Sequence, residues 1–197
     1  MNTLDYYNQN AELYTDGTVN ADVSALYSRF EPYLPPHASI IDLGCGSGRD
    51  SRHFIEAGYA VTAIDGSYEL CKKAELLIGQ PVRCLLFGEL DYEAAFDGAW
   101  ACASLLHVPK DEMPSVLQKI CRALKPGGVF YASYKYGQTE REAGGRHFSD
   151  YTENDLPIMT GFAPELTLAE YWISGDVRKD RTGEKWLNII WQKRNNA

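Results

Sequence analysis

Residues 42–48 combine one carboxylate with three closely spaced glycines directly after an apolar run. Positions 40–48 read IIDLGCGSG, and a helical pattern follows them. A strand that ends in such a turn lets a ligand approach the backbone, because glycine lacks a side chain and tolerates positive φ. A dinucleotide-binding G-x-G-x-x-G pattern would need its third glycine at position 49, where Arg49 stands. A pyrophosphate favours a neutral or positive loop, so the preceding Asp42 indicates a cationic ligand instead.

A second carboxylate ends the next expected strand. Asp65 follows an apolar run at 59–64, roughly twenty residues after the glycine loop. In dinucleotide folds an acid at this place accepts hydrogen bonds from both ribose hydroxyls. The alternative interpretation is a helix cap before Ser67.

Polar side chains also follow the expected strands at 82–87 and 97–103. Glu89 and Asp91 come after the first of these strands, and Ser104 and His107 come after the second. The carboxyl ends of parallel strands face the ligand crevice of an open α/β sheet. A neutral His107 can take a proton from an oxygen or nitrogen nucleophile. The alternative is a histidine that hydrogen-bonds the loop and packs under the ligand.

Two cations and one tyrosine complete the candidates for a substrate side. Lys135 follows the expected strand at 129–134, and Arg146 lies in a Gly-rich loop at 137–150 that is long enough to be a lid. Together they can bind a carboxylate or another anion, although a solvated charge is the alternative for each. Tyr14 belongs to an N-terminal segment that we expect to cover the ligand end of the sheet. Tyr14 either closes over the ligand or packs.

Strand and helix patterns alternate along the chain, which predicts a parallel sheet with helices on both faces. The expected strands are 40–43, 59–64, 82–87, 97–103 and 129–134, and the expected helices are 23–34, 47–57, 68–78 and 113–124. The last of these helices should end in a turn at 125–128, and a short helix is expected near 153–160. Two final strand-like runs, 166–173 and 185–192, have a short connection and should therefore pair antiparallel.

Composition and charge restrict the functional class. The chain has 197 residues, fits one domain, and has no apolar run near the roughly 18 residues of a membrane span. Its N-terminus lacks the pattern of a signal peptide. Five cysteines without a C-x-x-C motif indicate neither disulfides nor a metal site, and favour a reducing cytoplasm. A net charge of −8 without a basic cluster disfavours nucleic acid as a substrate.

The D-x-G-x-G-x-G spacing from Asp42 to Gly48 resembles the cofactor loop of class I S-adenosylmethionine-dependent methyltransferases. The resemblance spans about 39 to 194. It implies an α/β, Rossmann-like, seven-stranded and mostly parallel sheet with a C-terminal antiparallel hairpin and helices on both faces. It further implies a single methyltransferase domain over 1–197, divided into an N-terminal helical cap (1–36) and an S-adenosylmethionine-binding core (37–197).

The resemblance also implies residue roles. Backbone groups of the glycine loop would hold the methionine portion of the cofactor, Asp65 the ribose, and Glu89 with the Leu90 amide the adenine, with Asp91 as the competitor of Glu89. The expected cofactor residues are Asp42, Gly44, Cys45, Gly46, Ser47, Gly48, Asp65, Gly66, Ser67, Glu89, Leu90 and Ser104. We expect His107, Tyr14, Lys135 and Arg146 on the substrate side.

The segment at 103–109 lacks the Asn/Asp-Pro-Pro-Tyr/Phe motif of DNA and protein amine methyltransferases, and it lacks the Pro-Cys motif of cytosine-carbon enzymes. A small-molecule acceptor is therefore expected, in a cytoplasmic monomer or homodimer with no nucleic-acid or membrane partner. Segments 48–50, 103–107, 133–137 and 184–187 look distantly like small bacterial methyltransferases of the tellurite-resistance type. The alternatives are a catalytically inactive protein that binds S-adenosylmethionine or S-adenosylhomocysteine, and a nicotinamide-dependent oxidoreductase.

Overall fold

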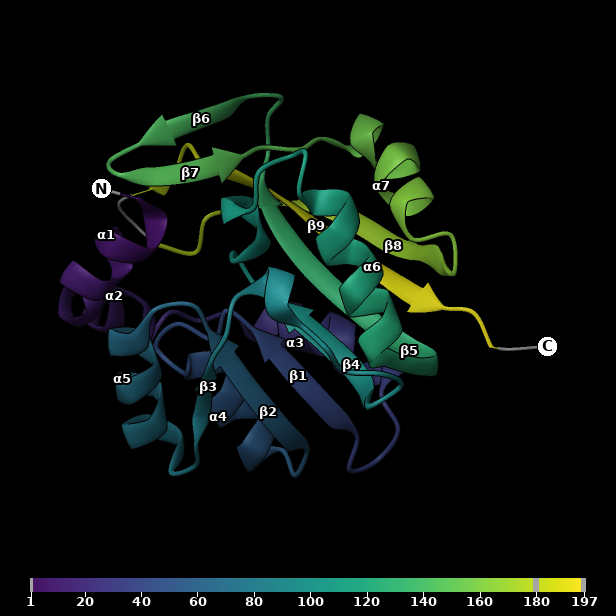
Figure 1. The fold of residues 1–197 in the computed structure, drawn as a ribbon, viewed down its shortest axis with the longest axis horizontal. Helices are drawn as coiled ribbons and strands as arrows, with labels where there is room; N and C mark the ends of the chain where they lie inside the picture. Colours follow the sequence, from purple (N-terminus) through teal and green to yellow (C-terminus); the bar gives the residue numbers. More distant parts are fainter. Residues whose placement is uncertain (1, 179–180, 196–197) are drawn as a thin grey trace.

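A seven-stranded sheet in the order β3-β2-β1-β4-β5-β9-β8 forms the centre of the computed structural model, which describes residues 2–178 and 181–195 (Figure 1). The strands are β1 Ser39–Leu43, β2 Ala60–Asp65, β3 Val82–Cys84, β4 Phe96–Ala101, β5 Leu124–Lys135, β8 Leu166–Gly175 and β9 Lys185–Lys193. The first five strands run parallel, while β9 pairs antiparallel with both β5 and β8. The predicted fold class is confirmed.

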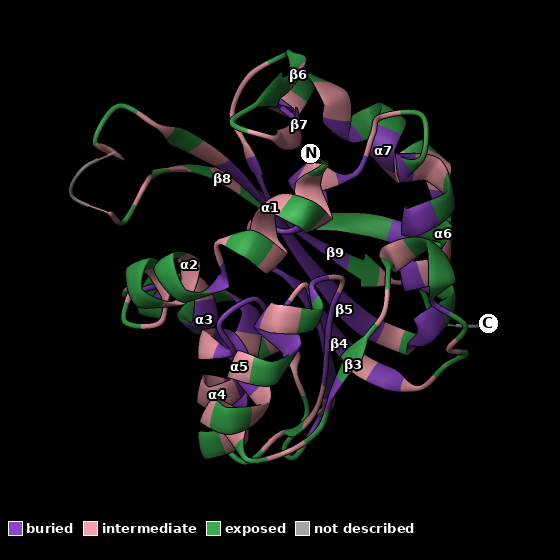
Figure 2. Cartoon of the chain, turned by 60° about the vertical axis from the view of Figure 1, so that its left-hand side comes forward, coloured by how far each residue is buried: buried purple, intermediate pink, exposed green. Residues whose placement is uncertain are grey.

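Helices cover both faces of the sheet, as the alternating pattern predicts (Figure 1). On one face α3 (Ser24–Phe30) and α4 (Arg49–Glu56) contribute Phe30 and Phe54 to a cluster with Ile40 of β1. On the other face α6 (Met113–Ala123) and α7 (Leu156–Phe162) pack on Ile41, the next residue of β1. Strands buried on both faces read as continuous apolar runs, because alternate side chains point to opposite sides. Figure 2 shows the central strands buried beneath partly exposed helices.

A buried carboxylate fixes α4 against the sheet. Asp50, on the first turn of α4, accepts hydrogen bonds from Tyr27 Oη of α3 at 2.6 Å and from Trp100 Nε1 of β4 at 2.8 Å. Arg49 adds bonds from Nε at 2.6 Å and from Nη2 at 3.0 Å. Burial opposes ionisation, but Arg49 and the other donors outweigh it and lower the pKa of Asp50. The start of α4, where the glycine loop ends, is therefore held to α3 and β4.

Two short helices form the N-terminal part of the chain. α1 (Thr3–Gln9) lies between α5 (Tyr68–Ile78) and the hairpin that follows β5 (Figure 1). Asn8 Oδ1 accepts hydrogen bonds from Ser67 Oγ at 2.8 Å and from the Glu69 amide at 3.2 Å. At the other end of α1, Thr3 Oγ1 accepts one from the His147 amide at 2.9 Å. α1 and α2 (Ala11–Thr18) thus cover the carboxyl ends of the strands. The domain division at 36/37 stays a prediction.

The segment predicted as a loop at 137–150 is instead a β-hairpin. β6 (Glu140–Ala143) pairs antiparallel with β7 (Arg146–Ser149). Gly144 and Gly145 join them with φ of 57° and 78°, which is the conformation that a two-residue hairpin turn requires. The loop prediction was wrong because polar residues on a two-stranded sheet outside the main sheet give no apolar alternation.

Several element boundaries also differ from the predictions. The strand expected at 82–87 ends at Cys84 and gives way to a 3₁₀ helix at Phe87–Glu89. The helix expected at 23–34 ends at Phe30 and continues as a 3₁₀ turn at Glu31–Tyr33. β5 begins at Leu124 and includes the expected turn at 125–128, with an irregular register against β4. Within the described part of the chain, no helix combines the length and apolar character that a membrane crossing requires.

Candidate active site

A cavity of about 290 Å³ lies at the carboxyl ends of β1, β2, β3 and β4. Its floor comes from the segments after these strands, and its roof comes from α1 and α2 through Thr3, Leu4, Tyr7 and Tyr14. The volume is near the lower end of the range for ligand pockets, roughly 300–1,000 Å³. This is the edge of the sheet where the sequence predicts a ligand.

The glycine loop presents its backbone to this cavity. Gly44 and Gly46 line it, with φ of 76° and 55°. A Cβ on Gly44 would lie 2.6 Å from Ser104 Cβ, and one on Gly46 would lie 3.0 Å from the Tyr14 ring. Gly48 lies outside the cavity lining and is the N-cap of α4. A Cβ on Gly48 would come within 3.1 Å of Ala74, so the glycine allows α4 and α5 to pack closely.

Asp65 joins the glycine loop to the end of β2. Its Oδ2 accepts a hydrogen bond from the Gly46 amide at 2.9 Å, and its Oδ1 accepts one from the Ser67 amide at 2.8 Å. Asp65 also lines the cavity together with Gly66. Burial raises the pKa of Asp65. Each carboxylate oxygen has two lone pairs, so both can still accept a bond from a ligand hydroxyl. Ser67 is itself the N-cap of α5, where its side chain accepts from the Leu70 amide.

The other loop side chains that the sequence predicts at the cofactor lie outside the cavity lining. Asp42 is buried and accepts a hydrogen bond from Ser51 Oγ at 2.6 Å, and burial raises its pKa to about 8. Cys45 packs in the apolar cluster beneath α5. Ser47 Oγ accepts a bond from Thr18 Oγ1 of α2 at 3.3 Å. These three side chains therefore support the loop.

The segment after β3 supplies Glu89 to the cavity wall. Its Oε2 accepts a hydrogen bond from the Leu86 amide at 2.9 Å, which closes the 3₁₀ turn. Leu90 is buried in the core, and its amide points to the Phe87 carbonyl at 3.4 Å. Asp91, the competitor of Glu89 in the sequence analysis, is exposed and outside the lining. Ser104 lines the cavity and donates to the Leu43 carbonyl at 2.6 Å.

His107 lies in a 3₁₀ turn after β4 and faces the cavity with a defined tautomer. Its Nδ1 is 2.6 Å from the His147 backbone carbonyl, which only a protonated nitrogen can bind. Its Nε2 is therefore the acceptor of the 2.8 Å hydrogen bond from Tyr7 Oη. Burial is the main cause that lowers the pKa of His107 to about 4. The imidazole is consequently neutral at pH 7.

Sequence reasoning missed Tyr7 as a site residue. Its ring contacts both Tyr14, at a centroid distance of 5.1 Å, and His107, at 5.4 Å. Burial raises the pKa of the Tyr7 phenol, so the group keeps its proton. Tyrosines at an N-terminus carry no local signal for a partner 100 positions away.

The two predicted cations lie outside this cavity. The guanidinium of Arg146 lies over the rings of Tyr6 and Phe148, at 4.4 and 5.1 Å from their centroids. Lys135 pairs with Glu184 and lines a second cavity. The structure therefore brings His107 and Tyr14 together with the glycine loop and Asp65. Arg146 lies outside the cavity lining, 6.0 Å from the Tyr7 ring, and Lys135 is separated from His107 by the Phe148 ring, which contacts both.

Comparison with known sequences shows similarity to methyltransferases. Residues 41–132 match the sequence model of a methyltransferase domain. The O-methyltransferase resE of Aspergillus sclerotiorum is 33% identical over 45% of this chain and 36% of its own length. The putative methyltransferase YqeM of Bacillus subtilis is 29% identical over 68% of this chain and 57% of its own length. The chain thus spans roughly a third to three fifths of these curated relatives.

Solved structures extend the similarity over nearly the whole chain. A Burkholderia thailandensis 1,6-didemethyltoxoflavin-N1-methyltransferase, solved with 1,6-didemethyltoxoflavin and S-adenosylhomocysteine bound, is 26% identical with a TM-score of 0.74. The match covers 97% of this chain and 85% of that one. A Methanosarcina mazei S-adenosylmethionine-dependent methyltransferase shares the fold, with a TM-score of 0.75 at 22% identity over 86% of this chain and 99% of that one.

The close contact at Gly44 makes a testable prediction about the loop. Gly44→Ala should weaken S-adenosylhomocysteine binding at least tenfold, because the new Cβ displaces the loop from Ser104. Gly79→Ala is the matched control, since Gly79 also has positive φ, 69°, but its Cβ would meet open space. Calorimetric titration measures both variants. If Gly44→Ala and Gly79→Ala bind S-adenosylhomocysteine equally well, the contact of the new Cβ with Ser104 does not weaken binding. Only the cost of a left-handed backbone, about 1–2 kcal/mol, would then remain as the effect of the substitution.

The environment of His107 predicts a pH-dependent stability. Its pKa is about 4 in the folded chain, against the ordinary value of 6.5, so between these values the unfolded chain binds a proton that the folded chain does not. Stability should therefore fall as the pH drops from 6.5 to 4. Relative to His107→Gln, the wild type should lose roughly 2 kcal/mol of unfolding free energy between pH 7 and pH 4.5, measured by urea titration. An unchanged gap between the two proteins would contradict the lowered pKa.

Proposed function

We propose that this chain, which belongs to the class I S-adenosylmethionine-dependent methyltransferases, transfers a methyl group from S-adenosylmethionine to a small-molecule acceptor. The family and the cofactor are as the sequence predicts. The observation that carries the proposal is one cavity that joins the glycine loop, Asp65 and a neutral His107 under an aromatic roof.

The residues around the cavity fit the cofactor. Gly44 and Gly46 leave room for the methionine portion beside the loop backbone, where side chains would collide with Ser104 and Tyr14. Asp65 supplies two acceptor oxygens for the ribose hydroxyls, and Glu89 offers a carboxylate for the adenine amino group. When bound, S-adenosylmethionine supplies an electrophilic methyl group. The remaining predicted positions, Asp42, Cys45, Ser47, Gly48, Gly66, Ser67, Leu90 and Ser104, shape the loops that hold these groups.

Tyr7 and His107 form the acceptor side of this proposal. The Tyr7 hydroxyl donates to His107 Nε2, and its oxygen, beside the Arg146 guanidinium, has two lone pairs, one of which can accept a hydrogen bond from an O–H or N–H of the acceptor. As the acceptor atom gains a methyl group and loses its proton, that proton passes to Tyr7 while the Tyr7 proton passes to Nε2. The His147 carbonyl orients the ring and stabilises the imidazolium that forms. Positioning by the roof supplies the rest of the effect.

The same proposal includes the cellular setting. A net charge of −8 without a basic cluster supports a small acceptor over a nucleic acid. The five cysteines are free thiols, which supports a reducing cytoplasm. We propose a monomer or homodimer. The tellurite-resistance resemblance and the substrate-side roles of Lys135 and Arg146 likewise stay proposals.

Calorimetric titration with S-adenosylhomocysteine, with NAD as the paired control, tests the function. We expect saturable binding of the first ligand alone. Asp65→Ala should weaken it roughly 10–100-fold, because hydrogen bonds to a charged group contribute about 1.5–3 kcal/mol. The matched control is Asp91→Ala, which removes an exposed carboxylate outside the cavity and should bind as the wild type does. Binding of NAD alone would overturn the proposal.

Loss of the Tyr7 hydroxyl tests the acceptor side. A panel of small phenols, amines, carboxylic acids and heterocyclic N–H compounds is screened for release of S-adenosylhomocysteine. With an acceptor that turns over, Tyr7→Phe should lower kcat at least tenfold and leave S-adenosylhomocysteine affinity unchanged, since the ring stays. Tyr6→Phe removes a hydroxyl on the same helix outside the cavity and should keep full activity. S-adenosylhomocysteine binding without turnover of any panel member would support the inactive binding protein.

A further inference from the structure

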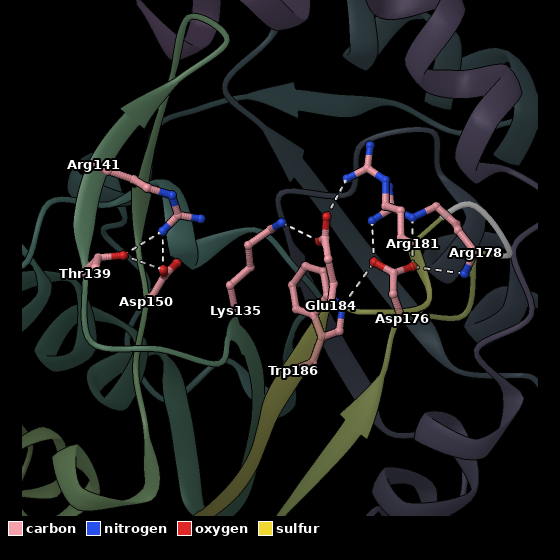
Figure 3. Close-up of polar contacts among 9 residues, drawn as sticks. All are labelled: Lys135, Thr139, Arg141, Asp150, Asp176, Arg178, Arg181, Glu184 and Trp186. Carbon is pink, nitrogen blue, oxygen red and sulfur yellow. Dashed lines mark hydrogen bonds and ion pairs between the residues drawn. The ribbon is translucent and has the colours of Figure 1, made fainter.

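A second cavity, of about 340 Å³, lies between the β6–β7 hairpin and the turn that joins β8 to β9. Its charged lining consists of Lys135, Arg141, Asp150, Glu184 and Lys185. Figure 3 shows that Lys135 lies between Arg141 with Asp150 on one side and Glu184 on the other. We propose that this cavity binds an anionic group, a carboxylate or a phosphate, of the methyl acceptor; the inference rests on the function proposed above.

Arg141 is held in place on the hairpin side of the cavity. Asp150 is buried, and its Oδ2 accepts hydrogen bonds from Thr139 Oγ1 at 2.8 Å and from Arg141 (Figure 3). Nη1 of Arg141 donates hydrogen bonds to Thr139 Oγ1 and to Asp150 Oδ2, and the guanidinium lies 5.2 Å from the Phe148 ring. A guanidinium has five N–H donors, so several stay available for a carboxylate or phosphate.

Lys135 supplies the central cation, between Arg141 and Glu184 (Figure 3). Its ammonium group lies 5.6 Å from the Phe148 ring and 5.8 Å from the Trp186 ring, and its side chain is only 18% exposed. Trp186 is itself fixed, because its Nε1 donates to Asp176 Oδ2 at 3.1 Å. Burial opposes ionisation of Asp176, but its hydrogen bonds with Arg178 outweigh that and lower its pKa to about 2. The two rings and the pair with Glu184 therefore hold the Lys135 ammonium in position before any ligand arrives.

The counter-ion of Lys135 can be exchanged. Glu184 pairs with Lys135 through Oε2, and its Oε1 lies 3.7 Å from Arg181 Nη1 (Figure 3). When the Lys135 ammonium turns to an anionic ligand, Glu184 keeps a cationic neighbour and stays half-exposed to water. No buried charge is then left without a partner, which is the costly outcome when an ion pair is broken. The lining carries three cations against two carboxylates, so it favours an entering anion in an otherwise acidic protein.

Phe148 lies between this cavity and the proposed reaction site. Its ring is 5.0 Å from the His107 ring and also contacts Lys135 and Arg141. An acceptor with its anionic group between Lys135 and Arg141 would therefore reach His107 and Tyr7 only past the Phe148 ring, which must turn aside when the acceptor binds. The second cavity would then select acceptors that carry a negative charge.

Amide and indole chemical shifts test the binding step directly. The ¹⁵N-labelled full chain, saturated with S-adenosylhomocysteine, is titrated with inorganic phosphate and separately with acetate, at constant ionic strength set with chloride. We expect saturable shifts at the Gly183 amide and the Trp186 indole, and the tighter probe identifies phosphate or carboxylate as the group. Lys135→Gln should raise the dissociation constant at least tenfold. Lys72→Gln, which removes an exposed lysine paired with Glu69 on α5, should leave it unchanged.

Shifts that do not saturate, or equal affinities in Lys135→Gln and wild type, would overturn the anion site. S-adenosylhomocysteine affinity measured on the same variants separates this failure from failure of the proposed function, because Lys135 lies outside the cofactor cavity. The acceptor panel supplies the second readout, with each acid paired with its methyl ester. Lys135→Gln should raise KM for the acid more than KM for its ester, and Lys72→Gln should change neither. Equal turnover of acid and ester by the wild type would show that the site does not select the acceptor.

Discussion

Backbone amides of the glycine loop bond to the end of the neighbouring strand, and the rest of the site depends on these bonds. The amides of Gly44 and Cys45 both point to the Ile64 carbonyl at 2.9 Å, and the Gly46 amide donates to the Asp65 carboxylate. The loop can turn this tightly because its glycines occupy positive φ. The buried Asp50 then fixes the helix that follows. The part of the cavity floor that the glycine loop forms is thus set by main-chain geometry.

The contacts around His107 are built differently, from groups of distant segments. Tyr7 comes from the N-terminus, His107 from the segment after β4, and the His147 carbonyl from the β6–β7 hairpin. The His147 carbonyl binds Nδ1 of His107, and the Tyr7 hydroxyl binds Nε2. The imidazole therefore faces the cavity in a single tautomer. Phe148, next to His147, separates this arrangement from the charged cavity around Lys135. The hairpin therefore orients His107 of the first cavity and lines the charged cavity with Arg141.

The sequence predicts features that depend on local pattern and misses those that depend on distant contacts. The helix predicted at 68–78 matches α5, because its apolar spacing, its Ser67 cap and its terminal Gly79 are all local signals. Gly44 and Asp65 could be placed at one sheet edge because parallel strands end together. The pairing of Tyr7 with His107 spans 100 positions and has no periodic signature. The exclusion of Lys135 from the first cavity likewise depends on its contacts with Phe148 and Glu184. Phe148 is brought to Lys135 by the β6–β7 hairpin, and Glu184 by the turn before the antiparallel strand β9.

Every residue of α1 retains some contact with solvent, and the helix is only seven residues long. It is held by side-chain hydrogen bonds at Thr3, Tyr7 and Asn8, without a buried apolar anchor of its own. Segments with so few buried contacts open locally at far lower free energy than the core. Opening of α1 would therefore uncover the cavity without disturbing the sheet. Where such a segment covers a site, the slow step of turnover is often the departure of product, on the microsecond to millisecond scale of lid motion. If α1 opens in this way, its stability would set how long a bound ligand stays, as well as the shape of the cavity.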